Sequence, residues 1–345
     1  MDEVRWHALS ADDFEGRGWK DTESPFDRIP AKVKEILPGV WKNNFHSSAG
    51  MCAHFVTESA QIRIRCELGS EQLGEPNFNV AAFSGTALYV CDPREKRWRW
   101  AAATPHFALN DRNPDYVLLE GLPREKRRYR LYLPFRNQIL KIAVGIDRNA
   151  GWAVTPPRTE PPLVYYGTSL IHGAFVTHPG LGTAQIVARE LDLPLVNMGF
   201  SGSAKLEIEM ARLLAELDAR IYVIDAYHNL TAELIEERME PFLHELCARR
   251  PGTPVLFLGA PAVLNAWLKP DRLQIDEKKI TLMGKIAKKI KKRYANLHYL
   301  KGTNFYGSDD VSIDGIHVND AAFGHMSKIL IRKIRTILDG GGKCA

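Results

Sequence analysis

One serine, and one histidine that follows an aspartate, have the residue types and spacing of a nucleophilic catalytic centre. Ser169 comes after the short apolar segment 164–166 and Gly167. This pattern predicts a buried strand that the glycine ends, with the serine at its carboxyl end, where α/β proteins place their chemistry. A serine hydroxyl is a weak nucleophile and needs a base that a third group orients. Asp314 and His317 can supply orienter and base from one turn or short helix, so the three residues predict acyl transfer.

Two segments between them can supply hydrogen-bond donors for an oxyanion. Residues 195–202 predict a strand that runs into a glycine-rich turn, and Gly202 would let a backbone N–H approach a substrate oxygen. Residues 221–225 predict another strand, and Asn229 lies on the loop after it with a side-chain amide that can donate. The alternatives are a plain turn glycine and an asparagine that caps the helix expected from residue 231.

Ser169, Gly202, Asn229 and His317 match, in order, the four blocks of the SGNH (GDSL-like) hydrolases. The chain resembles this family over residues 163–334, and it looks closest to the branch with an N-terminal β-sandwich, akin to two-domain carbohydrate esterases. The resemblance implies a flavodoxin-like α/β/α domain and an esterase or acylhydrolase activity without metal or organic cofactor. It also implies that Ser169 is the nucleophile and His317 the base oriented by Asp314. The oxyanion would bind the backbone N–H groups of Ser169 and Gly202 and the amide of Asn229.

The chain departs from the family pattern at two places. Thr168 stands where the family name implies an aspartate, and residues 227–230 read Tyr-His-Asn-Leu where Gly-X-Asn-Asp is usual. The second departure predicts a bulkier pocket wall with a different charge. Tyr227, His228 and Trp267 are therefore candidate substrate-binding residues, and Trp267 could stack on a sugar ring. Simple packing is the alternative for each of the three.

The segments that must position these residues change character near residue 150. Earlier segments alternate apolar and polar residues with period two, which predicts an all-β sandwich or jelly roll; they lie at 62–68, 87–91, 129–133 and 140–146. Later, strand-like segments alternate with helix-like segments at 183–191, 206–217, 231–249 and 275–294, and a fourth strand is expected at 255–258. This alternation predicts an α/β domain with a mostly parallel sheet. The predicted organisation is a β-sandwich domain at 1–154, a proline-rich connector at 155–162, a hydrolase-like domain at 163–339 and a flexible tail at 340–345.

Composition excludes few classes of partner. The formal charge of +5 is modest, and no run of eighteen apolar residues is present, so we expect no membrane span. The first residues show no signal peptide, which predicts a cytoplasmic protein, or a secreted one if a leader was removed. An odd number of cysteines without Cys-X-X-Cys spacing predicts free or buried thiols rather than a disulfide framework; they are Cys52, Cys66, Cys91, Cys247 and Cys344.

Two further patterns suggest ligands, but each has a simpler interpretation. His172 and His178 follow the serine, yet no third ligand stands at metal spacing, so no metal site is expected. The basic run 285–293 is typical of a nucleic-acid patch. It overlies apolar residues at helical spacing, however, which favours the solvated face of an amphipathic helix; these residues are Ile280, Met283, Ile286, Ile290 and Tyr294.

Taken together, the residues and the resemblance lead to the expectation of a serine esterase that cleaves a short acyl ester through an acyl-serine. The resemblance favours acetyl on a carbohydrate hydroxyl, so the expected partner is a small-molecule or oligosaccharide ester. The alternatives are a carbohydrate-binding protein with an inactive hydrolase domain, and an acyltransferase that hands the acyl group to a sugar. The sequence gives no indication of the oligomeric state.

Overall fold

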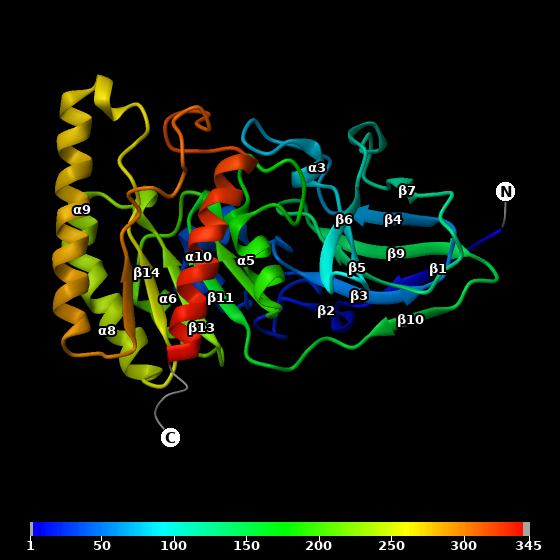
Figure 1. Ribbon diagram of the computed structural model, residues 1–345, viewed down its shortest axis with the longest axis horizontal. Helices are drawn as coiled ribbons and strands as arrows, with labels where there is room; N and C mark the ends of the chain where they lie inside the picture. Colours follow the sequence, from blue (N-terminus) through cyan, green and yellow to red (C-terminus); the bar gives the residue numbers. More distant parts are fainter. Residues whose placement is uncertain (1–2, 341–345) are drawn as a thin grey trace. The chain divides into compact units, whose positions relative to one another are not determined.

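The computed structural model describes residues 3–340, apart from the side chains at 43, 44 and 106 (Figure 1). Within this range the chain forms two compact units. The first comprises the described residues up to Ala31, together with Asn44–Thr159 and Val176–Leu181. The second comprises Lys32–Asn43, Glu160–Phe175 and the described residues from Gly182. Each unit therefore includes a short segment from outside the ranges predicted for its domain, and those ranges stay a prediction.

The first unit is an antiparallel β-sandwich, as the alternating segments predict. One sheet has the strand order β1-β9-β4-β7, and the other has β10-β3-β8-β5-β6 with β2 paired to β3. The strands of the first sheet are β1 (Val4–Leu9), β4 (Ile62–Leu68), β7 (Asp115–Leu119) and β9 (Ile139–Asp147). Those of the second are β2 (Phe14–Glu15), β3 (Cys52–Thr57), β5 (Ala87–Asp92), β6 (Arg97–Ala103), β8 (Arg127–Tyr132) and β10 (Trp152–Thr155). Short helical turns join them at η1 (Ala11–Asp13), α3 (Val80–Phe83) and η2 (His106–Ala108).

The period-two pattern predicts the core of the sandwich because alternate residues of a strand face the same side. Along β4 the side chains of Ile62, Ile64, Cys66 and Leu68 are buried, and those between them are not. They join one apolar cluster with residues of the other sheet, such as Leu131 of β8. The two sheets therefore pack face to face around this cluster.

The second unit is an α/β domain with a five-stranded parallel sheet in the order β12-β11-β13-β14-β15. The strands are β11 (Leu163–Gly167), β12 (Leu195–Gly199), β13 (Ile221–Asp225), β14 (Val255–Leu258) and β15 (Leu297–Leu300). The order reverses at β11, where the chain first moves to β12 and then returns past β11 to β13. Because parallel crossovers are right-handed, this reversal places helices on both faces of the sheet. It confirms the predicted flavodoxin-like architecture.

Where the sequence predicted a helix, the helix differs from the predicted segment mainly at its ends. The helices are α1 (Val33–Ile36), α2 (Pro38–Asn44), α4 (Ser169–His172), α5 (Thr183–Leu191), α6 (Ile208–Leu214), η3 (Tyr227–Asn229), α7 (Ala232–Leu234), the π-helical η4 (Ile235–Met239), α8 (Glu240–Arg249), η5 (Ala266–Leu268), α9 (Pro270–Lys291) and α10 (Asp320–Gly340). In Figure 1, α10 (red) packs against α5 (green), and α8 packs against α6 and α9. The segment expected as one helix at 231–249 is interrupted by η4, because Pro241 cannot donate a backbone hydrogen bond. Gly340 belongs to α10, and the rest of the expected tail lies outside the described residues.

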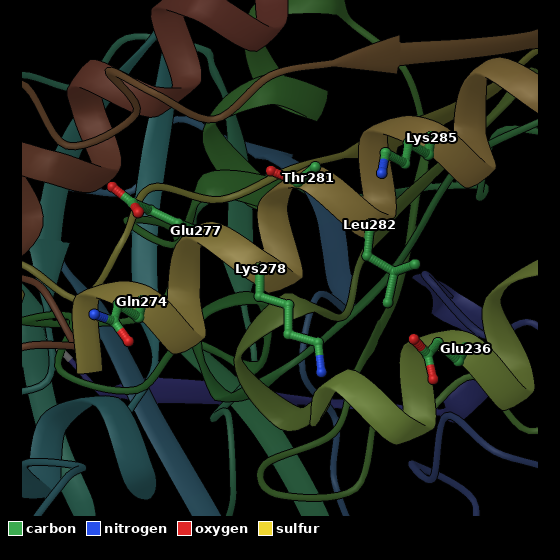
Figure 2. A pocket seen from close by; sticks show the side chains of 7 residues that line it. All are labelled: Glu236, Gln274, Glu277, Lys278, Thr281, Leu282 and Lys285. Carbon is green, nitrogen blue, oxygen red and sulfur yellow. The ribbon is translucent and has the colours of Figure 1, made fainter. Parts of the chain in front are cut away.

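The long helix α9 presents a mixed surface to solvent. It buries one stripe of residues, namely Asp276, Lys279, Met283, Ala287 and Ile290. On its exposed side, Figure 2 shows a shallow hollow in which Lys278 and Lys285 lie with Glu277, and with Glu236 of η4. Side chains of both charges lie there. This arrangement favours the interpretation of the basic run as a solvated helix face. None of the described helices is long and apolar enough to cross a membrane.

Candidate active site

Ser169 lies at the carboxyl edge of the parallel sheet, at the first residue of α4. The strand β11 continues through Gly167 and is not ended by it, and Thr168 provides the extended residue before the helix. A Cβ on Gly167 would come within 2.7 Å of Asp225 O, so glycine permits the close approach of β11 and β13. Gly173, with a φ of 100°, ends α4 after a single turn. This sharp strand-to-helix turn presents the Ser169 hydroxyl at the sheet edge.

The side chains of Ser169, His317 and Asp314 form a continuous hydrogen-bonded chain. His317 Nε2 lies 2.8 Å from Ser169 Oγ, and His317 Nδ1 lies 2.7 Å from Asp314 Oδ2. The second carboxylate oxygen accepts from the backbone N–H groups of Ile316 at 3.0 Å and His317 at 2.8 Å. Because the carboxylate accepts at Nδ1, that nitrogen carries the proton and Nε2 is free to accept from serine. The chain therefore has the polarity of a base-activated nucleophile.

The carboxyl of Asp314 is ionised at neutral pH. Partial burial by itself would raise its pKa, but hydrogen bonds from the backbone and ring of His317 and from Ile316 hold the pKa below its usual range. Gly315 has a φ of 95°, which allows the tight turn between Asp314 and His317. A charged carboxylate beside Nδ1 stabilises the imidazolium that forms when the serine loses its proton.

Two backbone N–H groups are available as oxyanion donors. Ser169 N is the first N–H of α4, and Gly202 N lies on the turn after β12. Within residues 3–340 neither group donates a hydrogen bond to the protein. Gly202 has a φ of 71°, and a Cβ there would meet no atom within 4 Å, so the backbone is open on that side. Unpaired N–H groups of this kind are what an oxyanion hole requires.

The amide of Asn229 is fixed by the same turn. One arm of the amide faces the N–H groups of Ser203 and Ala204 at 3.2 and 3.0 Å, and must therefore be the carbonyl oxygen. The NH₂ is then the other arm. Thr231, not Asn229, caps α7, since its hydroxyl accepts from Leu234 N. The capping alternative for Asn229 is thus taken by Thr231, and Asn229 joins η3 to the turn that carries Gly202.

The two residues before Asn229 are more buried than a pocket wall requires. Tyr227 has no exposed surface, and its hydroxyl donates to Asp276 Oδ1 at 3.1 Å. This placement corrects the expectation of a substrate contact and gives the ring a packing role. His228 Nε2 lies 2.9 Å from the Tyr306 hydroxyl, while its Nδ1 is buried without a partner in the described chain. Burial, and then the charges of Lys279 and His317, lower the pKa of His228 to about 3, so its ring is neutral.

Trp267, in contrast, is 70% exposed. It lies on η5, at the rim of a hollow of about 390 Å³ that Asp314 and Gly315 also line. Leu268 and Ile313, 62% and 51% exposed, line the same hollow. An exposed aromatic ring beside the triad carboxylate is available for contact with a bound substrate.

Sequence reasoning missed Asp225, the last residue of β13. It is 3% exposed, its backbone pairs with Gly167, and its carbonyl accepts from Thr168 N at 3.1 Å. Burial raises the pKa of its carboxyl to about 7. The only signal in the sequence was an acidic residue at the end of a wholly apolar strand.

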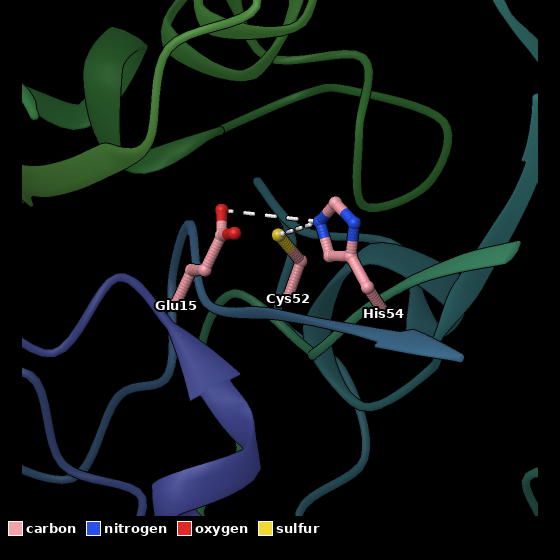
Figure 3. Close-up of side chains that lie close together, drawn as sticks. All are labelled: Glu15, Cys52 and His54. Atoms are coloured by element: carbon pink, nitrogen blue, oxygen red, sulfur yellow. Dashed lines mark hydrogen bonds and ion pairs between the residues drawn. The ribbon is translucent and has the colours of Figure 1, made fainter. Parts of the chain in front are cut away.

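Neither the two histidines that follow Ser169 nor a buried cluster in the sandwich has the chemistry of a metal site. His172 Nδ1 contacts Ser201 Oγ, and His178 Nδ1 donates to Pro179 O, and the two histidines belong to different units. In the sandwich, Glu15, Cys52 and His54 are buried with ligand atoms within 4.8 Å of one another (Figure 3).

Glu15 and His54 are, however, already engaged by cations. Arg130 Nε donates to His54 Nε2 at 3.2 Å, and Arg158 donates to both oxygens of Glu15 at 2.8 and 2.9 Å. Burial, and then Arg130, lowers the pKa of His54 to about 3. Two guanidinium groups in contact with the ligand atoms oppose a further cation. The cysteines at 52, 66, 91 and 247 are free, as predicted, and Cys344 lies outside the described residues.

Two family models match the chain. Residues 160–335, more than half of the chain, match the GDSL-like Lipase/Acylhydrolase family. Residues 4–151 match a model described as the N-terminus of Esterase_SGNH_hydro-type. No curated protein matches the chain.

Several solved structures share the fold over nearly the whole chain. A protein from Bacteroides ovatus described as a GDSL-like lipase has a TM-score of 0.89 and 24% identity, with 98% of each chain covered. The salicylyl-acyltransferase SsfX3 of a tetracycline biosynthetic pathway has a TM-score of 0.74 and 18% identity, covering 96% of this chain and 97% of its own. A family two carbohydrate esterase from Cellvibrio japonicus has a TM-score of 0.62 and 10% identity, covering 98% of this chain and 99% of its own. At these identities the likeness concerns the fold.

Proposed function

The chain belongs to the GDSL-like lipase/acylhydrolase family, and we propose that within this family it is a serine esterase that removes a short acyl group, acetyl in the first instance, from a carbohydrate hydroxyl. The observation that carries the proposal is the hydrogen-bonded chain from Ser169 Oγ through His317 to Asp314. The unpaired N–H groups of Ser169 and Gly202 beside it support the same reaction.

In the first half of the reaction, His317 Nε2 takes the proton of Ser169 as the serine oxygen attacks the ester carbonyl. The N–H groups of Ser169 and Gly202, with the amide NH₂ of Asn229, stabilise the negative charge on the carbonyl oxygen. Asp314 stabilises the imidazolium, which then protonates the leaving alcohol as the carbon–oxygen bond breaks. The product of this half is an acyl-serine and a free alcohol.

In the second half, water replaces the alcohol. His317 removes a proton from water, the hydroxide oxygen attacks the acyl carbonyl, and the same donors stabilise the second oxyanion. Collapse of this intermediate releases the carboxylic acid and returns the proton to Ser169. All groups used are side chains and backbone atoms of the second unit.

The preference for a carbohydrate alcohol rests on Trp267. Its exposed ring stands at the rim of the hollow beside Asp314, and aromatic faces bind the apolar faces of sugar rings. The fold likeness to the carbohydrate esterase from Cellvibrio japonicus supports the same substrate class. The likeness to the salicylyl-acyltransferase, with its higher TM-score, favours a second candidate, in which an acceptor alcohol replaces water.

A panel of esters tests the proposal. Purified protein is incubated with 4-nitrophenyl acetate, butyrate and octanoate, with acetylated xylo- and cello-oligosaccharides, and with an acyl thioester, and released acid is measured. We expect turnover to fall with acyl length and to be largest on the acetylated sugars, with Ser169→Ala as the inactive control. Preference for octanoate or the thioester would contradict the proposed substrate. Adding an acceptor sugar separates the second candidate, because a transferase would form new ester at the expense of free acid.

A further inference from the structure

The buried stripe of α9 changes from charged to apolar residues along its length. Asp276 has no exposed surface and Lys279 is 4% exposed, whereas Met283, Ala287 and Ile290 continue the stripe with apolar side chains. Apolar residues would suffice to pack a helix on a sheet, and a buried charge is costly unless it is hydrogen-bonded. The charged residues occur only in the first half of the helix, which follows β14 at the carboxyl edge of the sheet. We therefore asked what these two charged residues contact at that edge.

Asp276 accepts hydrogen bonds from two different segments around the active site. Its Oδ1 accepts from the hydroxyl of Tyr227 at 3.1 Å, and its Oδ2 accepts from Val263 N at 2.9 Å. Tyr227 opens η3, the turn that ends with Asn229. Arg272 Nε, at 3.2 Å from Oδ2, neutralises the carboxylate from the same helix. One carboxylate thus ties the turn that carries Asn229 to the loop after β14.

The loop after β14 leads on to the triad. Leu264 N, next to Val263, donates to Gly315 O at 2.8 Å, inside the tight turn between Asp314 and His317. A Cβ on Gly315 would come within 2.9 Å of the Val263 side chain, so the two segments are in direct contact. A chain of contacts therefore runs from η3 through Asp276 and Val263 to the turn of His317.

Lys279 reinforces the first link of this chain. Its Nζ lies 4.1 Å from the centre of the Tyr227 ring and 3.4 Å from Tyr227 O. Burial lowers the pKa of this ammonium to about 8. Tyr227 is accordingly held at both its hydroxyl and its carbonyl, which leaves the η3 turn little freedom.

We propose that Asp276 is a positioning residue, which through Tyr227 and Val263 fixes the spacing between the oxyanion donor Asn229 and the base His317. The inference rests on the proposed esterase function, because the spacing matters only if both groups act on one carbonyl. Oxyanion donors stabilise the transition state only at a narrow distance from the developing charge, and small displacements are costly. Loss of the Asp276 contacts should therefore lower kcat rather than substrate affinity.

A double-mutant cycle tests the inference. Tyr227→Phe removes the hydroxyl that Asp276 accepts from and keeps the ring. We expect it to lower kcat on 4-nitrophenyl acetate about tenfold with KM nearly unchanged. Asn229→Ala should lower kcat about 10²–10³-fold. If Tyr227 acts through Asn229, adding Tyr227→Phe to Asn229→Ala should cost less than about twofold more. Asp276→Asn, which leaves one acceptor, should behave like Tyr227→Phe.

Tyr222→Phe is the matched control. Tyr222 lies on β13, the strand that leads to η3. Its buried hydroxyl donates to Leu217 O near the amino end of that strand. The Tyr222→Phe variant should lose about as much thermal stability as Tyr227→Phe, and it should keep the wild-type kcat. Equal kcat in Tyr227→Phe and Tyr222→Phe, or fully additive losses in the cycle, would overturn the inference while the esterase function stands. A wild-type protein without turnover on any ester would remove the function, and the inference with it. If Asp276→Asn does not fold, the two tyrosine variants decide alone.

Discussion

At the scale of single residues, the proposed mechanism makes the Ser169 hydroxyl the group that forms the covalent bond to the acyl carbon. Ser169→Ala should lower turnover of acetyl esters by several orders of magnitude, since the oxyanion donors and the binding site remain but the nucleophile is lost. The circular dichroism spectrum and the melting temperature should stay close to wild type, because the substitution removes a single oxygen whose side-chain hydrogen bond is to His317. More than a tenth of the wild-type rate in the purified variant would contradict a serine mechanism.

In the proposed mechanism, Asp314 acts on the same reaction through its negative charge. Its pKa lies below the usual range, so the carboxylate is negative throughout the neutral range and stabilises the protonated form of the neighbouring ring. Asp314→Asn should lower kcat/KM substantially, and it should move the acid limb of the pH–rate profile to lower pH because the imidazolium loses its counter-charge. The measurement is the profile of both proteins on one soluble acetyl ester. An unchanged limb with nearly full activity would leave a dyad of Ser169 and His317.

The residues that sequence alone could identify are those with a fixed local signature. Ser169, Asp314 and His317 stand in short patterns that state their geometry. Asp225 and Asp276 carry no such pattern, because their burial arises from strands and helices that meet only in the folded chain. Tyr227 shows the opposite error, since its position beside Asn229 suggested a pocket wall while its side chain points into the core.

At the scale of elements, the packing of α4 on β12 depends on one glycine. A Cβ on Gly199 would overlap the backbone of Ile171 and His172, which cannot move without shifting Ser169. Gly199→Ala should therefore destabilise the protein by about 1–3 kcal/mol and lower kcat as well. Gly324→Ala is the matched control, since a Cβ within α10 meets nothing within 4 Å. It should stabilise the helix by up to about 1 kcal/mol with kcat unchanged, as measured by chemical denaturation and steady-state kinetics.

The hydrophobic period of the sequence predicted whether a segment forms a helix or a strand, but it did not predict the residues at which these elements begin and end. The strands β4, β5, β8 and β9 and the helix α5 lie close to where the alternation predicts them. Both α10 and β15 were missed, although α10 is 21 residues long. The short strand β15 is only partly buried beyond Leu297, so its sequence lacks the apolar run that marked the other strands. Its place is set by pairing with β14, a contact between distant segments.

At the scale of the whole molecule, stability should depend on pH through Asp225. Its pKa is about 7 in the folded protein, against about 3.9 in an unfolded chain. The folded state therefore binds the extra proton between these values, so the stabilising contribution is complete below pH 4 and is lost as the pH rises through 7. Asp225→Asn mimics the protonated form. Its free energy of unfolding should exceed that of the wild type increasingly from pH 5 to pH 8, by at most about 4 kcal/mol.

Urea denaturation at several pH values measures this difference. A constant difference between the two proteins across the range would mean that Asp225 is ionised in the folded state. A carboxyl that is neutral in the folded protein is also compatible with the position of Asp225 next to the turn that carries Ser169. In the proposed mechanism, the neutral carboxyl adds no negative charge next to the turn that carries Ser169.

The two-part architecture could be predicted because composition and period change together near residue 150. Contiguous domains were predicted because a proline-rich connector is a common place for a domain boundary. Membership of residues 32–43 and 176–181 in the opposite unit depends on which core their side chains join. No local pattern in a twelve- or six-residue segment records that choice.

This interleaving constrains how the protein can be made and divided. A ribosome releases residues 32–43 long before the unit that they complete, and the sandwich still lacks residues 176–181 when its last strand, β10, has emerged. Neither unit can thus finish during synthesis before part of the other is present. A gene cut at the proline-rich connector would likewise give two halves that each lack a piece of their own fold. Separate expression of the halves requires moving those segments, not only choosing a cleavage point.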